Sequence, residues 1–392
     1  MKLLFTHELH AVEHGGRFYN PAGVINYEAL CNYLHTIRQG VVVLRCGRVE
    51  KVDPGWPRVD GPGVEVQPIP EFGRLGQFLK ALPATVKAIW KAINRTDRHV
   101  LRLPGPTGAL VGLVLLLRGR RYGVELAGHY EVEVLRELIR RRRLGPAWGP
   151  VVINWLIARL VSRAVAVGYR SRYLRSLYPS FRRDREYVFS GAVLKPEIVT
   201  GPREARHFAK RPFRVASIGR VGYAKGYPLL VRAFARARAQ TDVPMELEIV
   251  GDGDEMPEVR QQVHALGLDG VVSLPGRVEW GPELFARLDG AHLFVLASLI
   301  DGMPRSVIEA MARGMPVIST TAGGIPELVD AQYLVPPGDE DALVAKIAAL
   351  VGNTRGLAEM SRRSFERSKE HWPARLDRAK RGFWGRVVRY AR

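Results

Sequence analysis

The sequence predicts an α/β protein built from two Rossmann-like domains. Its 392 residues are enough for two domains with sizeable cores, and short apolar runs alternate with segments of helical spacing. The clearest example is the apolar run 293–296, which is followed by a glycine turn, a helical segment at 306–313 and a second apolar run at 316–319. Strand, helix and strand in this order form a βαβ unit, and open α/β sheets bind ligands at the carboxyl ends of their strands.

The net charge of the chain indicates which classes of partner it binds, and its cysteine content indicates its compartment. The formal net charge of +20 favours a phosphate-bearing substrate, an anionic lipid surface or nucleic acid, and an arginine-rich solvated surface is the alternative. Nucleic acid is not expected, because no known recognition module is present. Cys31 and Cys46 lack disulfide or metal-ligand patterns, which fits a reduced, cytoplasmic compartment. No secretory signal or membrane span is expected, so any membrane contact would be peripheral, on the inner face of the cell membrane.

The N-terminal domain is expected over residues 1–195. An apolar strand at 3–6 runs into a predicted loop over 7–23, which contains Gly15 and Gly16 and precedes a helix over 24–39. The glycine pair can form a simple turn, since glycine adopts a positive φ without steric cost. A later strand is expected at 122–126, and Gly128 and His129 follow it.

A basic and aromatic cluster follows in the same domain. Five arginines between residues 136 and 143 precede Trp148, and Trp155 lies in the next apolar helix. Cations beside tryptophans suit the headgroup region of an anionic membrane. A solvated helix end explains the same residues equally well, so both interpretations stay open.

The C-terminal domain is expected over residues 196–370, around a hinge at 191–211 that has little periodicity and two prolines. Its first strand, at 213–218, ends in Gly219-Arg220, and Lys225-Gly226 precedes a helix. An arginine presents a planar fork to two phosphate oxygens, while a lysine supplies a point charge. These residues therefore indicate a phosphate-binding element, and a salt-bridged surface pair is the alternative.

A second motif follows the strand at 293–296. Asp301 stands before the turn 302–304, and Glu309 lies about two turns into the helix. Ionised carboxylates only accept hydrogen bonds, so the two acids can bind the hydroxyls of a sugar and of a ribose. Free N–H groups at the helix start favour a negative or hydroxyl-rich ligand. The alternative is that Asp301 caps the helix and Glu309 lies on the surface.

Together the two motifs resemble the family-4 retaining glycosyltransferases of GT-B fold. The family signature is an acid, seven residues and a glutamate; here Asp301 replaces the usual first glutamate and Glu309 matches the second. The match continues through 310–312, 314–318 and 323–327, and it weakens before residue 165. The resemblance implies two Rossmann-like domains facing a cleft, with a C-terminal helix at 371–392 that returns to the N-terminal domain. A position on a membrane is the alternative for that helix.

The resemblance also implies catalytic and donor-binding roles. Arg220 and Lys225 would stabilise charge on a leaving diphosphate without a metal. Asp301 and the backbone of the turn would hold the donor sugar, and Glu309 would bind the ribose. The residues of that turn are Gly302, Met303 and Pro304.

Further candidates come from positions that the family uses near the donor. His129 is the candidate for a contact with the donor sugar, and an ordinary surface or core histidine is the alternative. Its competitors are His7, His10 and His14. The remaining donor-binding candidates are glycines near the phosphates and a pair near the nucleobase: Gly15, Gly16, Gly219, Arg277 and Val278.

The expected function is transfer of a sugar from a nucleotide-diphosphate donor, with retention, to a glycan or lipid-linked acceptor in cell-surface polysaccharide assembly. The expected partners are the donor, that acceptor and an anionic membrane surface, with no cofactor. One alternative is a non-catalytic, membrane-recruited protein that binds the nucleotide sugar. Another is a sugar-nucleotide epimerase of the same fold, for which no acid and base residues can be identified.

Overall fold

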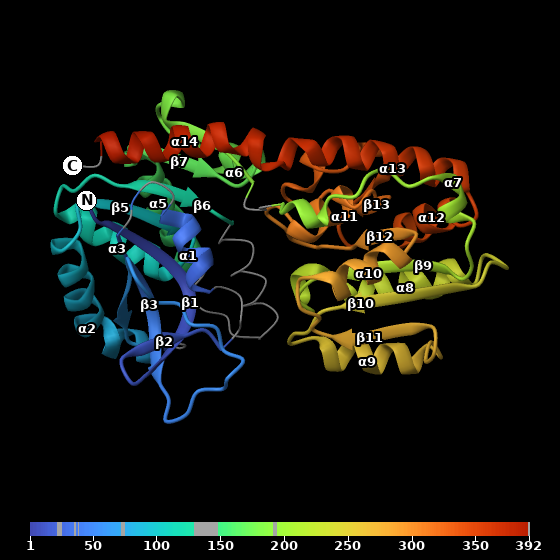
Figure 1. The fold of residues 1–392 in the computed structure, drawn as a ribbon, viewed down its shortest axis with the longest axis horizontal. Coiled ribbons are helices and arrows are strands. Elements are labelled where there is room, and N and C mark those ends of the chain that lie inside the picture. The colour runs from blue at the N-terminus through green and yellow to red at the C-terminus, as the bar shows by residue number, and fades with distance from the viewer. Residues whose placement is uncertain are drawn as a thin grey trace. The chain divides into compact units, whose positions relative to one another are not determined.

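A computed structural model of the chain, drawn in Figure 1, describes residues 1–21, 26–34, 37, 39–71, 75–128, 148–190 and 194–390. The chain forms two compact units. Unit 1 comprises Met1–Arg170, Arg175–Val188 and Arg378–Arg392, and unit 2 comprises Ser171–Leu174 and Phe189–Asp377. Domain boundaries were expected after residues 195 and 370; the units instead change at Val188 and at Asp377, and a short segment at 171–174 joins unit 2.

That short segment joins unit 2 because a carboxylate holds it. The backbone N–H groups of Arg172 and Tyr173 donate to the two carboxylate oxygens of Glu327, at 2.9 and 2.8 Å. A carboxylate at a helix N-terminus satisfies N–H groups that have no partner inside the helix. Glu327 therefore caps helix α6, Arg172–Leu177.

Unit 1 contains a sheet with the strand order β4-β3-β1-β5-β6-β7-β8, in which all these neighbours are parallel. Its strands are β1 Leu3–His14, β2 Arg17–Tyr19, β3 Gly40–Arg48, β4 Val64–Ile69, β5 Arg98–Leu103, β6 Gly123–Leu126, β7 Ala166–Tyr169 and β8 Glu186–Val188. Its helices are α1 Tyr27–Leu34, α2 Leu75–Asn94, α3 Pro106–Leu117 and α5 Trp148–Arg163. Runs such as 41–44 are buried throughout, as expected for parallel strands covered on both faces.

The predicted loop over 7–23 is wrong. Strand β1 continues to His14, and Gly15 and Gly16, with φ of 56° and 74°, form the turn into the antiparallel strand β2. Two consecutive positive φ values are typical of a two-residue hairpin turn. Gly15 and Gly16 thus form a simple turn, which was one of the expectations from the sequence. Their contact with the phosphates of a donor stays a prediction.

Unit 2 contains a parallel sheet with the order β11-β10-β9-β12-β13-β14. The strands are β9 Phe213–Ile218, β10 Met245–Val250, β11 Val272–Gly276, β12 Leu293–Leu296, β13 Val317–Thr320 and β14 Leu334–Val335. The helices are α7 Ala205–Phe208, α8 Tyr227–Arg238, α9 Met256–Ala265, α10 Pro282–Gly290, α11 Arg305–Ala312, α12 Glu340–Leu350 and α13 Thr354–Ser368. This strand order is that of the dinucleotide-binding Rossmann fold.

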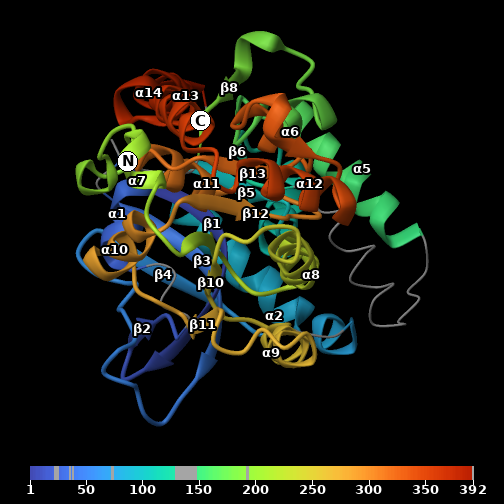
Figure 2. The same ribbon diagram turned by 90° about the vertical axis from the view of Figure 1, so that its right-hand side faces the viewer.

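Two hydrophobic cores cover the two faces of this sheet. Along β12, Leu293 and Val295 belong to the core under α8, α9 and α12, while Phe294 and Leu296 belong to the core under α10 and α11. Successive side chains of a strand point to opposite faces, so a fully buried run feeds both cores. Figure 2 shows α8 and α9 on one side of β10 and β11, with α10 on the other.

The last helix, α14 Pro373–Tyr390, returns to unit 1, as predicted for the C-terminal segment. Arg386 donates to the carbonyl of Val165 at 2.8 Å, and the guanidinium of Arg98 donates to the carbonyl of Val388 at 2.9 Å. Gly123 of β6 leaves room for this packing, because a Cβ there would lie 2.7 Å from the side chain of Val387. Among the described residues, none of the helices has the length and apolar content that a membrane crossing requires.

Candidate functional site

The candidate site lies in unit 2, at the carboxyl ends of β9 and β12. These strands are neighbours, but the chain leaves β9 toward β10 on one side and leaves β12 toward β13 on the other. The connections therefore diverge at this point of the sheet, which is the switch point where open α/β sheets bind ligands. The loop after β9 carries Arg220 and Lys225, and the loop after β12 carries Asp301.

Lys225 and Asp301 form an ion pair at this switch point, and the ammonium donates to a carboxylate oxygen of Asp301. The hydroxyl of Ser298 donates to the same oxygen at 3.4 Å. The Asp301 side chain is only 9% exposed, and that of Lys225 is 22% exposed. The carboxylate is thus held between a cation and a hydroxyl, with the ammonium still reachable from solvent.

The alternative in which Asp301 caps the following helix is wrong. Helix α11 begins after Pro304, which is its N-cap and has no side-chain oxygen to offer. Helix α8 likewise begins after Gly226 without a side-chain cap. Both helix N-termini at this switch point therefore lack a side-chain cap for their first N–H groups, and such termini suit anionic ligands.

Backbone contacts hold the two loops together. The N–H groups of Leu299 and Ile300 donate to the carbonyl of Ala224, at 2.9 and 3.2 Å. Gly226 has a φ of 64°, and a Cβ there would lie 2.2 Å from the carbonyl oxygen of Ala297. Only glycine allows this approach, so the residue after Lys225 fixes where its ammonium lies.

A second close approach fixes Asp301 itself. Gly323, with a φ of 54°, follows β13, and a Cβ there would lie 1.7 Å from the carbonyl oxygen of Asp301. Gly324 donates its N–H to the same carbonyl at 3.2 Å. The glycines at 323–324 therefore carry the backbone that presents Asp301. The sequence predicted this stretch as part of the motif but gave it no structural role.

Arg220 lies at the same edge with a different partner. Its guanidinium donates to Asp254 at 3.1 Å, and both side chains are largely exposed. The preceding residue, Gly219, packs closely against the loop after β10, since a Cβ on Gly251 would lie 1.9 Å from the Gly219 carbonyl oxygen. The turn at 251–254 thus brings an acid to Arg220.

Glu309 is half-buried in α11, and its contact with a ribose stays a prediction. Burial raises the pKa of its carboxyl, against the opposing effects of the nearby Arg305 charge and of a hydrogen bond from the Trp280 indole N–H. Trp280 packs edge-on against Phe285, with ring centroids 4.9 Å apart, and the Lys195 ammonium lies 5.1 Å from its ring. Trp280 is the site residue that sequence reasoning missed.

The loop after β11 brings this tryptophan to Glu309, and it is also the loop predicted to read the nucleobase. Arg277 is exposed there, while Val278 is partly buried against the core under α10 and α11. Met303, in the turn before α11, packs against the same core. A tryptophan following the predicted base-site pair was the available signal, because an exposed aromatic ring offers a stacking surface.

The role of a histidine at the donor sugar stays a prediction. His129 lies outside the described residues, as do the arginines at 136–143. His7 is buried in unit 1, where burial, followed by the charges of Arg102 and Arg170, holds its pKa well below the usual value. His10 and His14 are exposed along β1.

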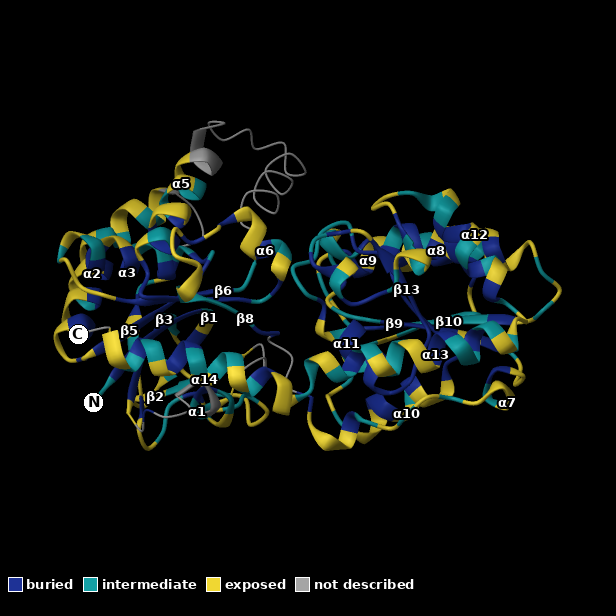
Figure 3. Cartoon of the chain, turned by 90° about the horizontal axis from the view of Figure 1, so that it is seen from above, coloured by how far each residue is buried: buried dark blue, intermediate teal, exposed yellow. Residues whose placement is uncertain are grey.

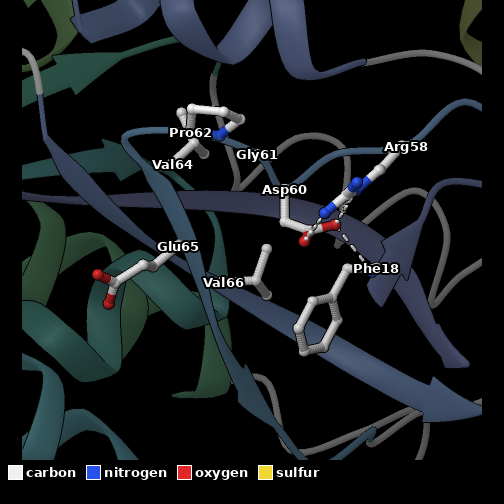
Figure 4. Close-up of a pocket in the computed structure, with 8 residues that line it drawn as sticks. All are labelled: Phe18, Arg58, Asp60, Gly61, Pro62, Val64, Glu65 and Val66. Atoms are coloured by element: carbon white, nitrogen blue, oxygen red, sulfur yellow. Dashed lines mark hydrogen bonds and ion pairs between the residues drawn. The ribbon is translucent and has the colours of Figure 1, made fainter. Parts of the chain in front are cut away.

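A separate hollow in unit 1, drawn in Figure 4, is no part of this site. Its lining includes Asp60, whose carboxylate accepts from Arg58 at 2.9 Å and from the backbone N–H of Phe18 at 2.9 Å. The side chain of Glu65 points away from these groups. Within the described ranges of both units, no group of three or more His, Cys, Asp or Glu side chains can hold a metal ion.

The model of the family "Glycosyl transferases group 1" matches residues 212–353, which include every site residue described above in unit 2 except Lys195. Residues 212–353 thus resemble the group 1 glycosyltransferases, and the fold is that of the GT-B glycosyltransferases. One relative in this group is a putative colanic acid biosynthesis glycosyltransferase, WcaL, from Salmonella typhimurium. It is 35% identical over 146 residues, or 35% of this chain and 36% of that protein. The chain thus spans little more than a third of this curated relative.

Solved structures of glycosyltransferase-like chains match over nearly the full length. HepE from Anabaena, crystallised with UDP-glucose, has a TM-score of 0.65 at 19% identity, and 99% of each chain is covered. The lipopolysaccharide outer core galactosyltransferase WaaB in its apo form has a TM-score of 0.66 at 14% identity, with 98% of this chain and 99% of that one covered. At these identities the likeness shows the fold of both units.

Proposed function

We propose that this chain is a group 1 glycosyltransferase that transfers a sugar from a nucleotide-diphosphate donor, with retention, to a glycan or lipid-linked acceptor in cell-surface polysaccharide assembly. The observation that carries the proposal is the Lys225–Asp301 pair at the switch point of unit 2, beside two helix N-termini without side-chain caps. A cation and backbone N–H groups suit a diphosphate, and a buried carboxylate suits sugar hydroxyls.

When the donor binds, Lys225 and Asp301 would separate, and each would contact the donor instead. Lys225 would turn from Asp301 to the diphosphate, and Asp301 would accept from a hydroxyl of the sugar. Arg220, which is largely exposed, would add a fork of donors to the same phosphates. These cations act on charge that grows as the diphosphate leaves, and contacts that strengthen in the transition state are the ones that accelerate a reaction.

Glu309 would bind the ribose hydroxyls, with the Trp280 indole N–H holding the carboxylate in place. The loop at 276–280 would then contact the nucleobase. HepE was crystallised with UDP-glucose, which makes uracil nucleotides the first donors to test.

The transfer would proceed by attack of the acceptor hydroxyl on the face that the diphosphate leaves. The bond from the anomeric carbon to the acceptor oxygen forms while the bond to the diphosphate oxygen breaks, and the hydroxyl proton passes to the diphosphate. Lys225 and Arg220 would supply the stabilising charge, so the proposal needs no divalent metal. No side chain of unit 2 at this edge is assigned as a nucleophile.

The class of acceptor is supported by charge and by the relatives. The net charge of +20 favours an acceptor or a surface that carries phosphate. WcaL is named for colanic acid biosynthesis, and WaaB for the lipopolysaccharide outer core. A lipid-linked acceptor at an anionic membrane surface is consistent with both.

A thermal-shift series with UDP, GDP, ADP and their common sugars tests the donor site. Ligand at ~100 times Kd raises the free energy of unfolding by about 2.7 kcal/mol, which is readily seen. We expect one nucleotide to stabilise the wild type, and Glu309→Gln to lose most of that shift. Exposed residues of unit 2 give matched controls, Glu258→Gln and Lys210→Met, which should keep it. The absence of a shift with every nucleotide would contradict donor binding.

Turnover is tested separately by the anomeric configuration of the product. With the donor identified, NMR of the transferred sugar should give the same configuration as the donor. An inverted product rules out the retaining reaction. Donor binding without transfer to any lipid-linked or glycan acceptor would favour the non-catalytic alternative.

A further inference from the structure

The outer surface of α2 in unit 1 is apolar where a solvent-facing helix is normally polar. Leu79, Val86 and Trp90 are 58%, 36% and 47% exposed, and Pro83 is exposed between them. Positions 79, 83, 86 and 90 have the spacing of one helical stripe. Single exposed apolar residues are ordinary, but a continuous stripe marks an interaction surface.

Helix α3 continues this surface. Leu113 and Leu117 are 41% and 80% exposed, and between Pro106 and Leu117 the only side chain that is not apolar is the buried Thr107. Helix α5 adds Val152 and Trp155, which are 50% and 66% exposed. These three helices of unit 1 therefore turn aliphatic and indole groups to solvent.

The three helices form one face. Helix α3 packs against both α2 and α5, and Figure 3 shows all three on one side of the unit 1 sheet with exposed residues along them. At their ends, the guanidinium of Arg118 lies 4.1 Å from the ring centroid of Trp90 and donates to Asn94 at 2.7 Å. The three helices are thus neighbours, and we name the surface that carries their exposed apolar residues the α2–α3–α5 face.

The charges on this face have one sign. The three helices contain five basic residues and no Asp or Glu. The basic residues, all exposed, are Lys80, Lys87, Lys91, Arg159 and Arg163. On α2 the lysines form a stripe next to the apolar one, so cationic and apolar groups alternate across the helix.

Helices of unit 2 differ from this face, because acids accompany their basic residues. There, Glu340 of α12 pairs with Arg232 and Arg236 of α8 at 2.7 and 3.0 Å. Glu359 of α13 pairs with Arg362 and Arg363 at 2.7 and 2.8 Å. These helices of unit 2 pair basic residues with acids, whereas the α2–α3–α5 face contains no acid.

We propose that the α2–α3–α5 face docks on the surface of an anionic phospholipid bilayer. Leucine and tryptophan side chains enter the headgroup boundary while the lysines contact lipid phosphates, as in helices that lie in the membrane plane. A nucleic acid would not use exposed leucines, since bases stack on aromatic rings. The inference rests on the proposed function only in placing a lipid-linked acceptor at that bilayer, because docking itself requires no turnover.

Vesicle sedimentation with the full chain tests the proposal. The probes are phosphatidylcholine vesicles with and without phosphatidylglycerol. We expect binding that requires the anionic lipid, and a weakening of about 100-fold in the triple variant Lys80→Gln/Lys87→Gln/Lys91→Gln, since each basic residue contributes about fivefold (~1 kcal/mol). The control is Lys210→Gln/Arg238→Gln/Arg355→Gln, which removes the same charge from exposed sites of unit 2 and should change the affinity by less than about threefold.

Apolar insertion is tested by Leu117→Ser, for which we expect about tenfold weaker binding. Phe181→Ser is its control, because Phe181 is 85% exposed in unit 1 outside the α2–α3–α5 face. Equal binding to both vesicle types, or equal losses in the variants and their controls, would overturn the proposal. So would capture of an acidic protein by the face with no binding to vesicles.

The nucleotide-induced thermal shift, measured without vesicles, separates this inference from the proposed function. Wild-type and lysine-variant proteins should give the same shift and the same melting temperature without ligand. Vesicle binding without any nucleotide shift leaves the docking surface standing and removes the donor site. A nucleotide shift without vesicle binding does the reverse.

Discussion

In both units a switch point lies beside the first strand. The two units differ in whether a side chain of the chain itself caps the helix N-terminus next to that switch point. In unit 2 the helices α8 and α11 begin after Gly226 and Pro304 with no side-chain cap. In unit 1 the Glu8 carboxylate accepts from the backbone N–H groups of Thr107 and Gly108 at the start of α3, at 2.9 and 3.3 Å. The chain itself therefore supplies the anion in unit 1.

The packing around Glu8 leaves no room for a ligand in its place. A Cβ on Gly105 would lie 2.0 Å from the Glu8 side chain, and the Arg45 guanidinium lies 3.4 Å from its carboxylate. Burial raises the pKa of Glu8, against opposing effects of Arg45 and of the hydrogen bonds at α3. The same strand order thus occurs beside helix N-termini that have no side-chain cap and beside one that a carboxylate already satisfies, so strand order alone does not make a nucleotide site.

The largest effect that tests this comparison is expected at Lys225. Lys225→Met removes the cation that would stabilise the leaving diphosphate, and we expect kcat to fall by about 10²–10³, as for loss of one electrostatic donor. Steady-state kinetics of sugar transfer gives this value. Lys210→Met serves as control, and a similar loss there would show that the effect is not specific to the switch point.

A smaller effect is expected at Glu309. Glu309→Gln keeps the size of the side chain but removes the charge that would accept from ribose hydroxyls, and hydrogen bonds to charged groups contribute about 1.5–3 kcal/mol. We expect the Kd of the nucleotide to rise roughly 10- to 100-fold, measured by titration calorimetry. Because burial raises the pKa of Glu309, wild-type affinity should also weaken toward acidic pH, and this pH dependence should flatten in the variant.

The buried His292 of unit 2 predicts acid sensitivity. Burial, with the nearby charges of His207 and Arg203, lowers its pKa to about 4, and its Nδ1 accepts from the Arg214 N–H at 2.9 Å. Between about pH 6.5 and 4 the unfolded chain binds a proton that the folded chain does not, so stability falls as the pH is lowered through this range.

The expected contribution of His292 to this loss, at pH 5 relative to pH 7.5, is on the order of 2 kcal/mol. His292→Asn should recover most of it, since an asparagine oxygen can still accept from Arg214. Urea unfolding at the two pH values measures the difference. An unchanged pH dependence in the variant would assign the acid sensitivity to other groups.

The smallest expected effect is on the free energy of unfolding and concerns Glu8 in unit 1. Glu8→Gln keeps an acceptor for α3 but weakens its hydrogen bonds, so we expect a loss of about 1 kcal/mol in unfolding free energy. The nucleotide-induced thermal shift should stay as in the wild type. A change in that shift would mean that unit 1 shares in donor binding through Glu8, against the contrast drawn above.

The site residues that could be predicted from the sequence are those that lie close together in one short motif. Lys225 lies next to a glycine before a helix, and Asp301 and Glu309 share one turn and helix. The ion pair between Lys225 and Asp301 joins residues 76 positions apart, and the Trp280–Glu309 hydrogen bond also joins separate elements. No local spacing encodes such pairs, because they depend on which strands are neighbours in the sheet.

The hairpin of β1 and β2 was missed for a different reason. Between Leu9 and His14 the buried positions Leu9 and Ala11 alternate with the exposed His10. This is the period of a strand, but three histidines and two glutamates between residues 7 and 14 make the segment look like a polar loop. The parallel pairing with β3, which includes a register shift between Thr6 and His10, is what orders it.

The pairing of Lys225 with Asp301 also bears on how a spent nucleotide would leave. In the proposed reaction the sugar is gone after transfer, so Asp301 loses its hydroxyl partners and competes with the diphosphate for the same ammonium. We expect the carboxylate to reclaim Lys225 and thereby to lower the barrier to product release. The ion pair between Lys225 and Asp301 would then favour dissociation of the nucleoside diphosphate. The variant Asp301→Asn, which lacks the carboxylate, should therefore release the nucleoside diphosphate more slowly than the wild type does.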